Sequence, residues 1–196
     1  MIIGLTGGIA SGKSTAARHL SENGAFVMDG DVLGHRAYEP NTAAFAQITE
    51  TFGSEVVGAD GQINRKALGG KVFGNPNALK QLTDILYPEI RRMFGEWIET
   101  TQADNPNALL VMDAAVLLEA GWEDLADETW VIIVDPNTAV SRAVARDGLD
   151  EAAVSKRIAS QLSNDERSAR ADVVIDNSGN EAALIARLAA ELARIR

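Results

Sequence analysis

The sequence predicts an α/β protein of three layers, with a five-stranded parallel sheet between helices. Five short apolar runs have the length of strands, and segments with helical periodicity separate them. The runs are continuously apolar, which is typical of strands that are buried on both faces. Strands that alternate with helices favour a parallel sheet with right-handed crossovers. The expected strands are residues 2–6, 25–28, 108–112, 129–134 and 172–175.

The C-terminal part of the chain carries clear helix signals. Ser163 and Glu166 have the spacing of a capping box, and Asn180 is a favourable residue to begin the last helix. In that helix, apolar side chains recur at spacings of four, four and three, which places them on one face. They are Leu184, Leu188, Leu192 and Ile195.

About 78 residues separate the second expected strand from the third, far more than a simple crossover needs. Asn75 followed by Pro76 is typical of a helix start. Helical periodicity is visible at residues 43–52, 65–73, 78–86 and 89–99. We expect one domain, 1–196, with a helical substrate-binding insertion at about 36–105, because ligands of open α/β folds bind where such insertions emerge. Extra packing against the sheet is the alternative.

Composition excludes several classes of function. The 196 residues include 18 Lys and Arg and 28 Asp and Glu, for a net charge of −10, which repels nucleic acid and anionic membranes. The chain has no Cys and two His, so thiolate metal sites and disulfides are excluded and little metal chemistry is left to His. We expect a soluble cytoplasmic protein without a membrane span. Its oligomeric state is left open.

A glycine-rich segment directly follows the first expected strand. Residues 7–14 read Gly-Gly-Ile-Ala-Ser-Gly-Lys-Ser and match G-x-x-x-x-G-K-[ST], the P-loop pattern, whose main-chain N–H groups cradle phosphates. The pattern predicts a nucleoside triphosphate site in which Lys13 neutralises charge and Ser14 holds Mg²⁺. A flexible turn between strand and helix is the alternative. The expected binding residues are Gly8, Ile9, Ala10, Ser11, Gly12, Lys13, Ser14 and Thr15.

Acidic residues follow two other expected strands. Asp29 and Asp31 come after the second strand, and we expect Asp31 to be the base that accepts the proton of a hydroxyl nucleophile. The alternative is that Asp29 ends the strand and Asp31 caps the next helix. Asp113 follows the third strand and is a candidate Mg²⁺ ligand, with Asp29 and Asp31 as competitors for the same ion.

Positive charge concentrates between the fourth and fifth expected strands. Arg142 and Arg146 share one helical face at i and i+4, and Arg146 precedes the hinge-like pair Asp147-Gly148. We expect a lid at about 143–168 that brings Arg146 onto the phosphates. A solvated face with ion pairs is the alternative, favoured for Lys156, Arg167 and Arg170.

An ordered set of segments, nearly end to end, resembles the dephospho-coenzyme A kinase family. They are Gly-Leu-Thr-Gly-Gly-Ile-Ala-Ser-Gly-Lys-Ser-Thr at 4–15, Asp29-Gly30-Asp31 with His35, Leu-Leu-Glu at 117–119, Arg142 to Arg146 with Asp147, Arg157-Ile158 with Gln161, and Ala-Asp-Val-Val-Ile-Asp-Asn at 171–177 with Gly179. The resemblance implies a P-loop kinase core with a helical coenzyme-binding region and a lid. It implies transfer of the γ-phosphate of ATP to the ribose 3′-hydroxyl of dephospho-coenzyme A, the last step of coenzyme A biosynthesis.

The resemblance also assigns roles. Asp31 would be the base, Arg146 the lid cation and Arg142 its neighbour. Asn177 would lie near the adenine of ATP, whereas turn chemistry alone makes it a plain turn residue. The adenosine end of the substrate would lie beneath the helical insertion.

The chain departs from the family pattern at four places. The family usually has His-Pro where this chain has Tyr87-Pro88. It usually has Pro-Leu-Leu where this chain has Val116-Leu117-Leu118. It tends to have Gln at the position of Ala139 and often Ala at that of Gly30. These departures concern substrate contacts and loop conformation, and leave the phosphate-binding residues unchanged.

Two other classes compete. Shikimate kinase also has Asp-x-Asp after its P-loop, but this chain lacks that family's Gly-Gly-Gly element and has only Gly69-Gly70, in the insertion. A guanine-nucleotide switch is suggested by D-x-x-G at residues 31–34, but this lies too close to Lys13 and no Asn-Lys-x-Asp element occurs.

Overall fold

The computed structural model describes residues 1–148 and 150–196. These residues form two compact units, one made of Met1–Met28 with Asn105–Arg196 and the other of Asp29–Asp104. The second unit covers most of the expected insertion at 36–105 but begins already at Asp29. Its role in substrate binding stays a prediction.

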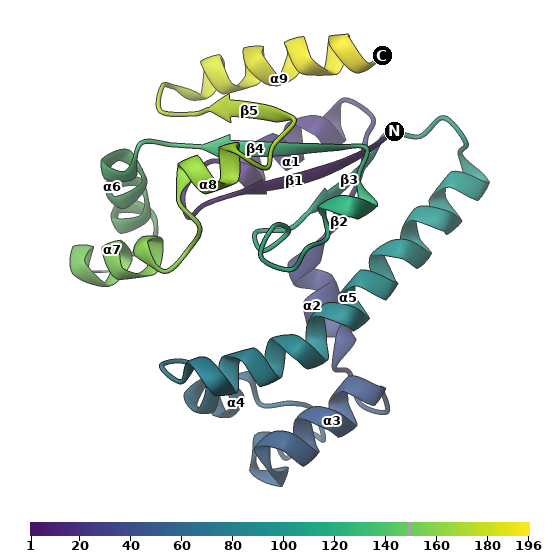
Figure 1. Cartoon of the computed structure of the whole chain (residues 1–196), viewed down its shortest axis with the longest axis vertical. Helices are drawn as coiled ribbons and strands as arrows, with labels where there is room; N and C mark the ends of the chain where they lie inside the picture. The colour runs from purple at the N-terminus through teal and green to yellow at the C-terminus, as the bar shows by residue number, and fades with distance from the viewer. Residues whose placement is uncertain (149) are drawn as a thin grey trace. The chain divides into compact units, whose positions relative to one another are not determined.

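The sheet has the five parallel strands that the apolar runs predict. Its order is β2-β3-β1-β4-β5, with β1 at the centre (Figure 1). The strands are β1 (Ile2–Gly7), β2 (Phe26–Asp29), β3 (Leu110–Asp113), β4 (Glu128–Ile133) and β5 (Val173–Asp176). Because parallel strands end at one edge, the P-loop after β1, Asp113 on β3 and Asn177 after β5 all lie at that edge.

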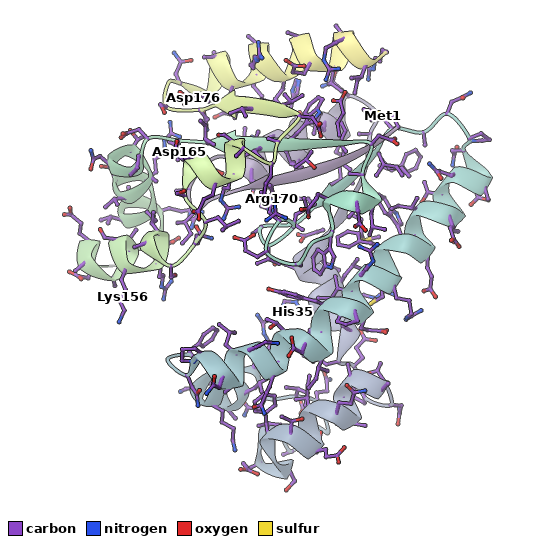
Figure 2. The ribbon with its side chains drawn as sticks, viewed as in Figure 1. Met1, His35, Lys156, Asp165, Arg170 and Asp176 are labelled. Atoms are coloured by element: carbon purple, nitrogen blue, oxygen red, sulfur yellow. The ribbon has the colours of Figure 1, made fainter. Side chains whose placement is uncertain are left out.

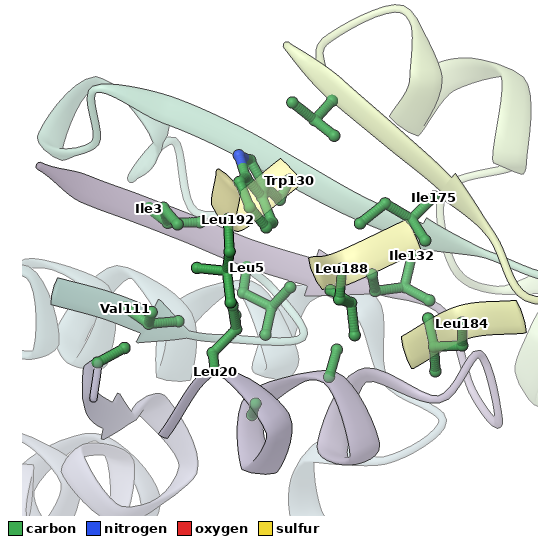
Figure 3. Packing of buried hydrophobic residues seen from close by; sticks show 14 residues of the cluster. Ile3, Leu5, Leu20, Val111, Trp130, Ile132, Ile175, Leu184, Leu188 and Leu192 are labelled. Carbon is green, nitrogen blue, oxygen red and sulfur yellow. The ribbon is translucent and has the colours of Figure 1, made fainter. Parts of the chain in front are cut away.

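Two helices cover one face of the sheet. They are α1 (Lys13–Glu22), which begins at the P-loop, and α9 (Glu181–Ile195), the last helix. The alternate residues Ile3 and Leu5 of β1, with Trp130 and Ile132 of β4, pack against them in a buried apolar cluster (Figure 3). The predicted apolar face of α9 is confirmed: Leu184, Leu188 and Leu192 are buried and Ile195 is partly buried.

The loop between β3 and β4 covers the other face of β1. A Cβ on Gly4 would lie 3.0 Å from Leu117 of that loop, and the Thr6 hydroxyl donates to the carbonyl of Ala115. The short helix η2 (Glu123–Leu125) follows in the same connection. The sheet is therefore covered on both faces, as its continuously apolar strands predict.

Among the described residues, three helices lie between β4 and β5, and they span the segment in which the lid is expected. They are α6 (Pro136–Asp147), α7 (Glu151–Ala159) and α8 (Asn164–Ser168). The expected lid at 143–168 includes residue 149, which lies outside the described residues. The predicted capping box of Ser163 and Glu166 is confirmed, as is the Asn180 cap of α9.

The second unit consists of helices around a smaller apolar core. They are α2 (Gly30–Ala37), α3 (Ala43–Phe52), η1 (Ser54–Val56), α4 (Arg65–Val72) and α5 (Pro76–Asp104). Ile48, Phe52 and Val72 are buried in this core. Among the described residues, no helix combines the length and apolar character that a membrane crossing requires.

The longest helix of this unit runs through a proline. The helical periodicity at 78–86 and at 89–99 is confirmed, and both segments belong to α5, a single helix with Pro88 inside it. Proline removes one hydrogen bond and usually kinks or ends a helix. Here α2, α3 and α4 all pack against α5, and it buries Ala78 before Pro88 and Phe94 after it. Packing on both sides of Pro88 keeps the helix continuous.

Candidate active site

The P-loop joins β1 to α1, and two of its glycines are required by close contacts. A Cβ on Gly7 would lie 2.6 Å from both the carbonyl oxygen of Ile132 and the hydroxyl of Ser11. Gly12 has φ +96° and a Cβ there would collide with the side-chain amide of Asn177. Ala10 also has a positive φ of 57°, which non-glycine residues adopt at an energetic cost. The loop therefore has a strained, tightly fitted backbone.

The N-terminus of α1 is arranged to bind an anion. Within the described part of the chain, no side chain caps α1 and its first turn holds no acidic residue, whereas α2, α3, α4, α6, α7, α8 and α9 each begin with a side-chain cap. The first N–H groups of a helix have no partner within the helix, and the positive end of its dipole favours negative charge. The glycine-rich loop and this helix end, here called the cradle, together suit the phosphates that the sequence predicts there, and phosphate binding by these residues stays a prediction.

Lys13 and Asp113 lie together beside this cradle. The Lys13 ammonium forms an ion pair with the carboxylate of Asp113 at the end of β3. Their side chains are only 16% and 9% exposed, so the pair is largely shielded from water. The sequence predicts both residues for the site but not their pairing.

A cavity of about 240 Å³ lies on one side of the cradle. Its lining includes Ala10, Gly12 and Thr15 from the loop and α1, together with Arg142 and Asn177. The Arg142 guanidinium donates to the carbonyls of Asn177 (2.9 Å) and Gly179 (2.8 Å). The two residues that the resemblance assigns to the nucleotide therefore lie together at the cradle.

Asn177 does more than form a turn. Its side-chain amide donates to the carbonyl of Ser11 over 2.8 Å, and the residue is only 6% exposed. This contact holds the P-loop to the end of β5. The prediction of a plain turn residue is therefore incomplete, because turn chemistry says nothing about a partner 166 residues away.

A larger cavity, of about 570 Å³, lies on the other side of the loop. It is lined by Gly8, Ile9 and Ser11 and by residues of α6 and of the segment from Ile158 to Glu166. The side-chain oxygen of Gln161 accepts the main-chain N–H of Ile9 over 3.0 Å. Gln161 is one of the residues by which the sequence resembles the family, but the resemblance assigns it no role. No local sequence signal predicts its contact with Ile9.

Arg146 lies on α6, one turn beyond Arg142, and pairs with its neighbour. Its guanidinium donates to both carboxylate oxygens of Asp147, at 2.7 and 2.8 Å. These hydrogen bonds lower the pKa of Asp147 and raise that of Arg146. The Arg146 side chain is 63% exposed.

The remaining basic residues of this region have different environments. Lys156 extends from α7 away from the sheet (Figure 2), and Arg170 pairs with Glu123. Arg167 departs from the solvated-face interpretation, because it is fully buried, with its guanidinium 2.9 Å from a carboxylate oxygen of Glu119. The spacing of charges along a helix does not show that Glu119, far away in the sequence, pairs with Arg167 and permits its burial.

The acidic pair after β2 belongs to the second unit. The carboxylate of Asp29 accepts the N–H of Asp31 over 2.7 Å and caps α2, while Asp31 lies in the first turn. The alternative that made Asp31 the cap is therefore wrong: Asp29 is the cap because its extended backbone lets its carboxylate reach the N–H two residues on. Asp31 is exposed, and the cap does not engage its carboxylate.

Oxygen donors for a cation are present at the cradle. Ser14 is exposed in the first turn of α1, and Asp113 at the end of β3 pairs with Lys13, the residue before Ser14. A hydroxyl and a carboxylate are the ligand types that Mg²⁺ prefers, usually together with water and phosphate oxygens. Among residues 1–148 and 150–196, no three His, Cys, Asp or Glu side chains cluster as a protein-only metal site. The donors therefore fit an ion that arrives with phosphates.

Comparison with known proteins identifies the chain's relatives. The family model described as CoaE, dephospho-CoA kinase, matches residues 1–183. A dephospho-CoA kinase of Geobacter sulfurreducens is 44% identical over 188 residues, which cover 95% of this chain and 94% of that protein. The crystal structure of TT1252 from Thermus thermophilus has a TM-score of 0.82 and 34% identity, covering 100% and 98% of the two chains.

A shikimate kinase structure shares the fold alone. The enzyme of Bacteroides thetaiotaomicron aligns over 98% of each chain with a TM-score of 0.56 and 14% identity. The architecture is therefore common to kinases with different acceptors, and the fold does not by itself select the acceptor.

Proposed function

The chain belongs to the dephospho-CoA kinase family, and from this membership we propose how its residues transfer the γ-phosphate of ATP to the ribose 3′-hydroxyl of dephospho-CoA. It is an ATP-dependent phosphotransferase of coenzyme A biosynthesis. The observation that carries the proposal is the uncapped N-terminus of α1 behind a glycine-rich loop, with Lys13 beside it. This arrangement suits the charge of a triphosphate.

The nucleotide is proposed to lie along the loop with its adenine towards Arg142 and Asn177. The cavity beside these residues adjoins Gly12 and Thr15, so a base there leaves the phosphates at the cradle. The planar guanidinium of Arg142 offers a surface on which an aromatic base can stack. Lys13 would then exchange its contact with Asp113 for the phosphate oxygens.

Asp31 is proposed as the base. It would orient the 3′-hydroxyl and accept its proton as the new bond from the ribose oxygen to phosphorus forms and the bond from phosphorus to the bridging oxygen of ADP breaks. Its exposed carboxylate, in the first turn of α2 with the cap supplied by Asp29, supports this role. The second unit, Asp29–Asp104, is proposed to hold the remainder of dephospho-CoA.

Three further assignments complete the proposal. Arg146 would leave Asp147 and contact the phosphates when the lid, residues 143–168, closes and excludes water. Ser14 and Asp113 would hold Mg²⁺, which when bound screens the charge of the phosphates. The cytoplasm is proposed as the compartment, supported by a chain without Cys.

The proposal is tested by incubating the protein with ATP, Mg²⁺ and dephospho-CoA and measuring coenzyme A by mass spectrometry. Parallel reactions contain shikimate or gluconate as the acceptor, and one contains EDTA. We expect that dephospho-CoA is the only one of the three acceptors to be phosphorylated, giving coenzyme A. We expect no product in the reaction with EDTA. Phosphorylation of shikimate or gluconate without formation of coenzyme A would overturn the assignment of the acceptor.

A further inference from the structure

Two cavities adjoin the P-loop, and its leading residues line only one of them. Ala10 and Gly12 line the cavity of about 240 Å³ that contains Arg142, the proposed adenine side. Gly8 and Ile9, together with Ser11, line the cavity of about 570 Å³ on the lid side. If the adenine occupies the first cavity, the triphosphate runs towards Gly8 and Ile9. The leading half of the loop then meets the terminal phosphate, and its shape determines how that phosphate is held.

The leading half is held by one long-range contact from a side chain. The Gln161 oxygen accepts the Ile9 N–H over 3.0 Å, and a Cβ on Gly8 would lie 3.6 Å from the same oxygen. Asn177 holds the other half through the carbonyl of Ser11. The loop is therefore fastened at two points, one on each side of the cradle.

The segment that carries Gln161 is itself fixed to the core. Asn164 donates its side-chain amide to the carbonyl of Val134 over 2.8 Å, at the end of β4. The buried Arg167 donates to the carbonyl of Leu162 over 3.2 Å and to Glu119 over 2.9 Å. A chain of contacts thus runs from the loop after β3, through Arg167 and the residue next to Gln161, to the P-loop.

We propose that Gln161 is a positioning residue that sets the leading half of the P-loop for the terminal phosphate, and that Glu119 and Arg167 hold Gln161 in place. The inference rests on the proposed ATP site. Gln161 touches the loop backbone and supplies no charge, so it acts through the direction of the Ile9 peptide. Gln161 therefore strengthens the binding of ATP more than that of ADP, since only ATP has a phosphate at that end.

The first test is Gln161→Met, which has a side chain of similar length without the amide oxygen. Isothermal titration should give a Kd for ATP raised about fivefold to tenfold, as expected for one lost hydrogen bond, with the Kd for ADP changed less than about twofold. Gln81→Met, on the exposed side of α5, is the matched control and should leave both constants unchanged. If the ratio of the Kd for ATP to the Kd for ADP is the same in Gln161→Met as in the wild type, the inference is overturned.

Amide hydrogen exchange of Ile9, measured by NMR without nucleotide, tests the contact independently of binding. Gln161→Met should make this amide exchange at least about tenfold faster, because the N–H loses its acceptor. Gln161→Glu retains an acceptor and should keep the amide protected. Equal exchange in the wild type and Gln161→Met would show that the contact does not hold the loop in solution, and the inference would fall.

Glu119→Gln tests the support behind Gln161. Its neutral amide weakens the contact with Arg167, so the ratio of ATP to ADP constants should shift in the same direction by about twofold. Combined with Gln161→Met it should add nothing further, because both changes act through one contact. Full additivity would contradict the support role. Wild-type protein that fails to bind ATP would instead overturn the proposed function, and this inference with it.

Discussion

The ammonium of Lys13 and the carboxylate of Asp113 form an ion pair at the mouth of the phosphate cradle, although 100 residues separate them in the chain. Lys13 is at the start of α1 and Asp113 is at the end of β3, the strand next to β1. The pair gives each side chain a partner where water is largely excluded. A triphosphate bound as proposed would offer Lys13 a more strongly charged partner than Asp113.

Lys13→Ala should weaken ATP binding and lower turnover together. A charge-assisted hydrogen bond contributes about 1.5–3 kcal/mol, so we expect the Kd for ATP to rise about tenfold to a hundredfold. Titration calorimetry and a coenzyme A assay measure the two effects. Lys80→Ala removes only an exposed pair with Asp84 and serves as the control. ATP affinity and turnover like those of the wild type would remove Lys13 from the site.

Asp31→Asn should lower turnover by about 10²- to 10⁴-fold while ATP still binds, if Asp31 is a general base of ordinary strength. The matched variant is Asp29→Ser, because serine also caps a helix but carries no carboxylate. We expect it to lose less than about tenfold. The wild type, Asp31→Asn and Asp29→Ser are compared by steady-state kinetics at saturating ATP. A larger loss in Asp29→Ser than in Asp31→Asn would move the base to Asp29.

Much of the fold is predictable because it rests on local pattern. The central strands β1, β3 and β4 are largely buried on both faces, so their apolar runs are continuous. The predicted positions of all five strands lie within two residues of those observed. The sequence shows helical periodicity on both sides of Pro88 but does not show that one helix runs through it, because that continuity depends on packing along α5. The competition between one lost hydrogen bond and tertiary packing is not visible in the sequence of α5.

The candidate site, like the fold, has a part that the sequence predicts and a part that it does not. The P-loop is predictable because its phosphate contacts come from consecutive main-chain groups, which fix the residue types at each position. The contacts that hold it are different: Gln161 and Asn177 reach it from 152 and 166 residues away. Periodicity and spacing contain no information about such pairs. Both residues belong to the family pattern, but the pattern does not show which main-chain groups of the P-loop they contact.

Arg142→Met should weaken ATP binding about tenfold and have little effect on the KM for dephospho-CoA. The change removes the guanidinium that bonds Asn177 and Gly179 and lines the proposed adenine cavity, while a flexible apolar side chain fills part of the space. Arg187→Met on α9, which removes one ion pair of Glu191 and leaves its pair with Arg194, is the control. Binding of ATP and of inorganic triphosphate is compared. If both ligands lose affinity equally, Arg142 acts on the phosphates rather than on the base.

The pairing of Arg146 with Asp147 makes the position of Arg146, the proposed lid cation, measurable through a titration. Two hydrogen bonds from Arg146 lower the pKa of Asp147 below the ordinary value of an aspartate. Since the folded-state pKa is lowered, the pair stabilises the protein above the ordinary aspartate pKa, and this contribution is lost as pH falls through the folded-state pKa. Any event that removes Arg146 should raise the pKa of Asp147 again.

The titration of the Asp147 carboxyl carbon, followed by NMR, should therefore shift upward in two cases. Arg146→Gln removes the guanidinium, and a non-hydrolysable ATP analogue should draw Arg146 onto the phosphates, so both should return the pKa of Asp147 towards its ordinary value. Glu128 is the internal control, because hydrogen bonds from Arg194 lower its pKa and neither change touches them. If Arg146→Gln raises the pKa of Asp147 but the analogue does not, Arg146 stays on Asp147 when nucleotide binds, and another residue must supply the lid cation.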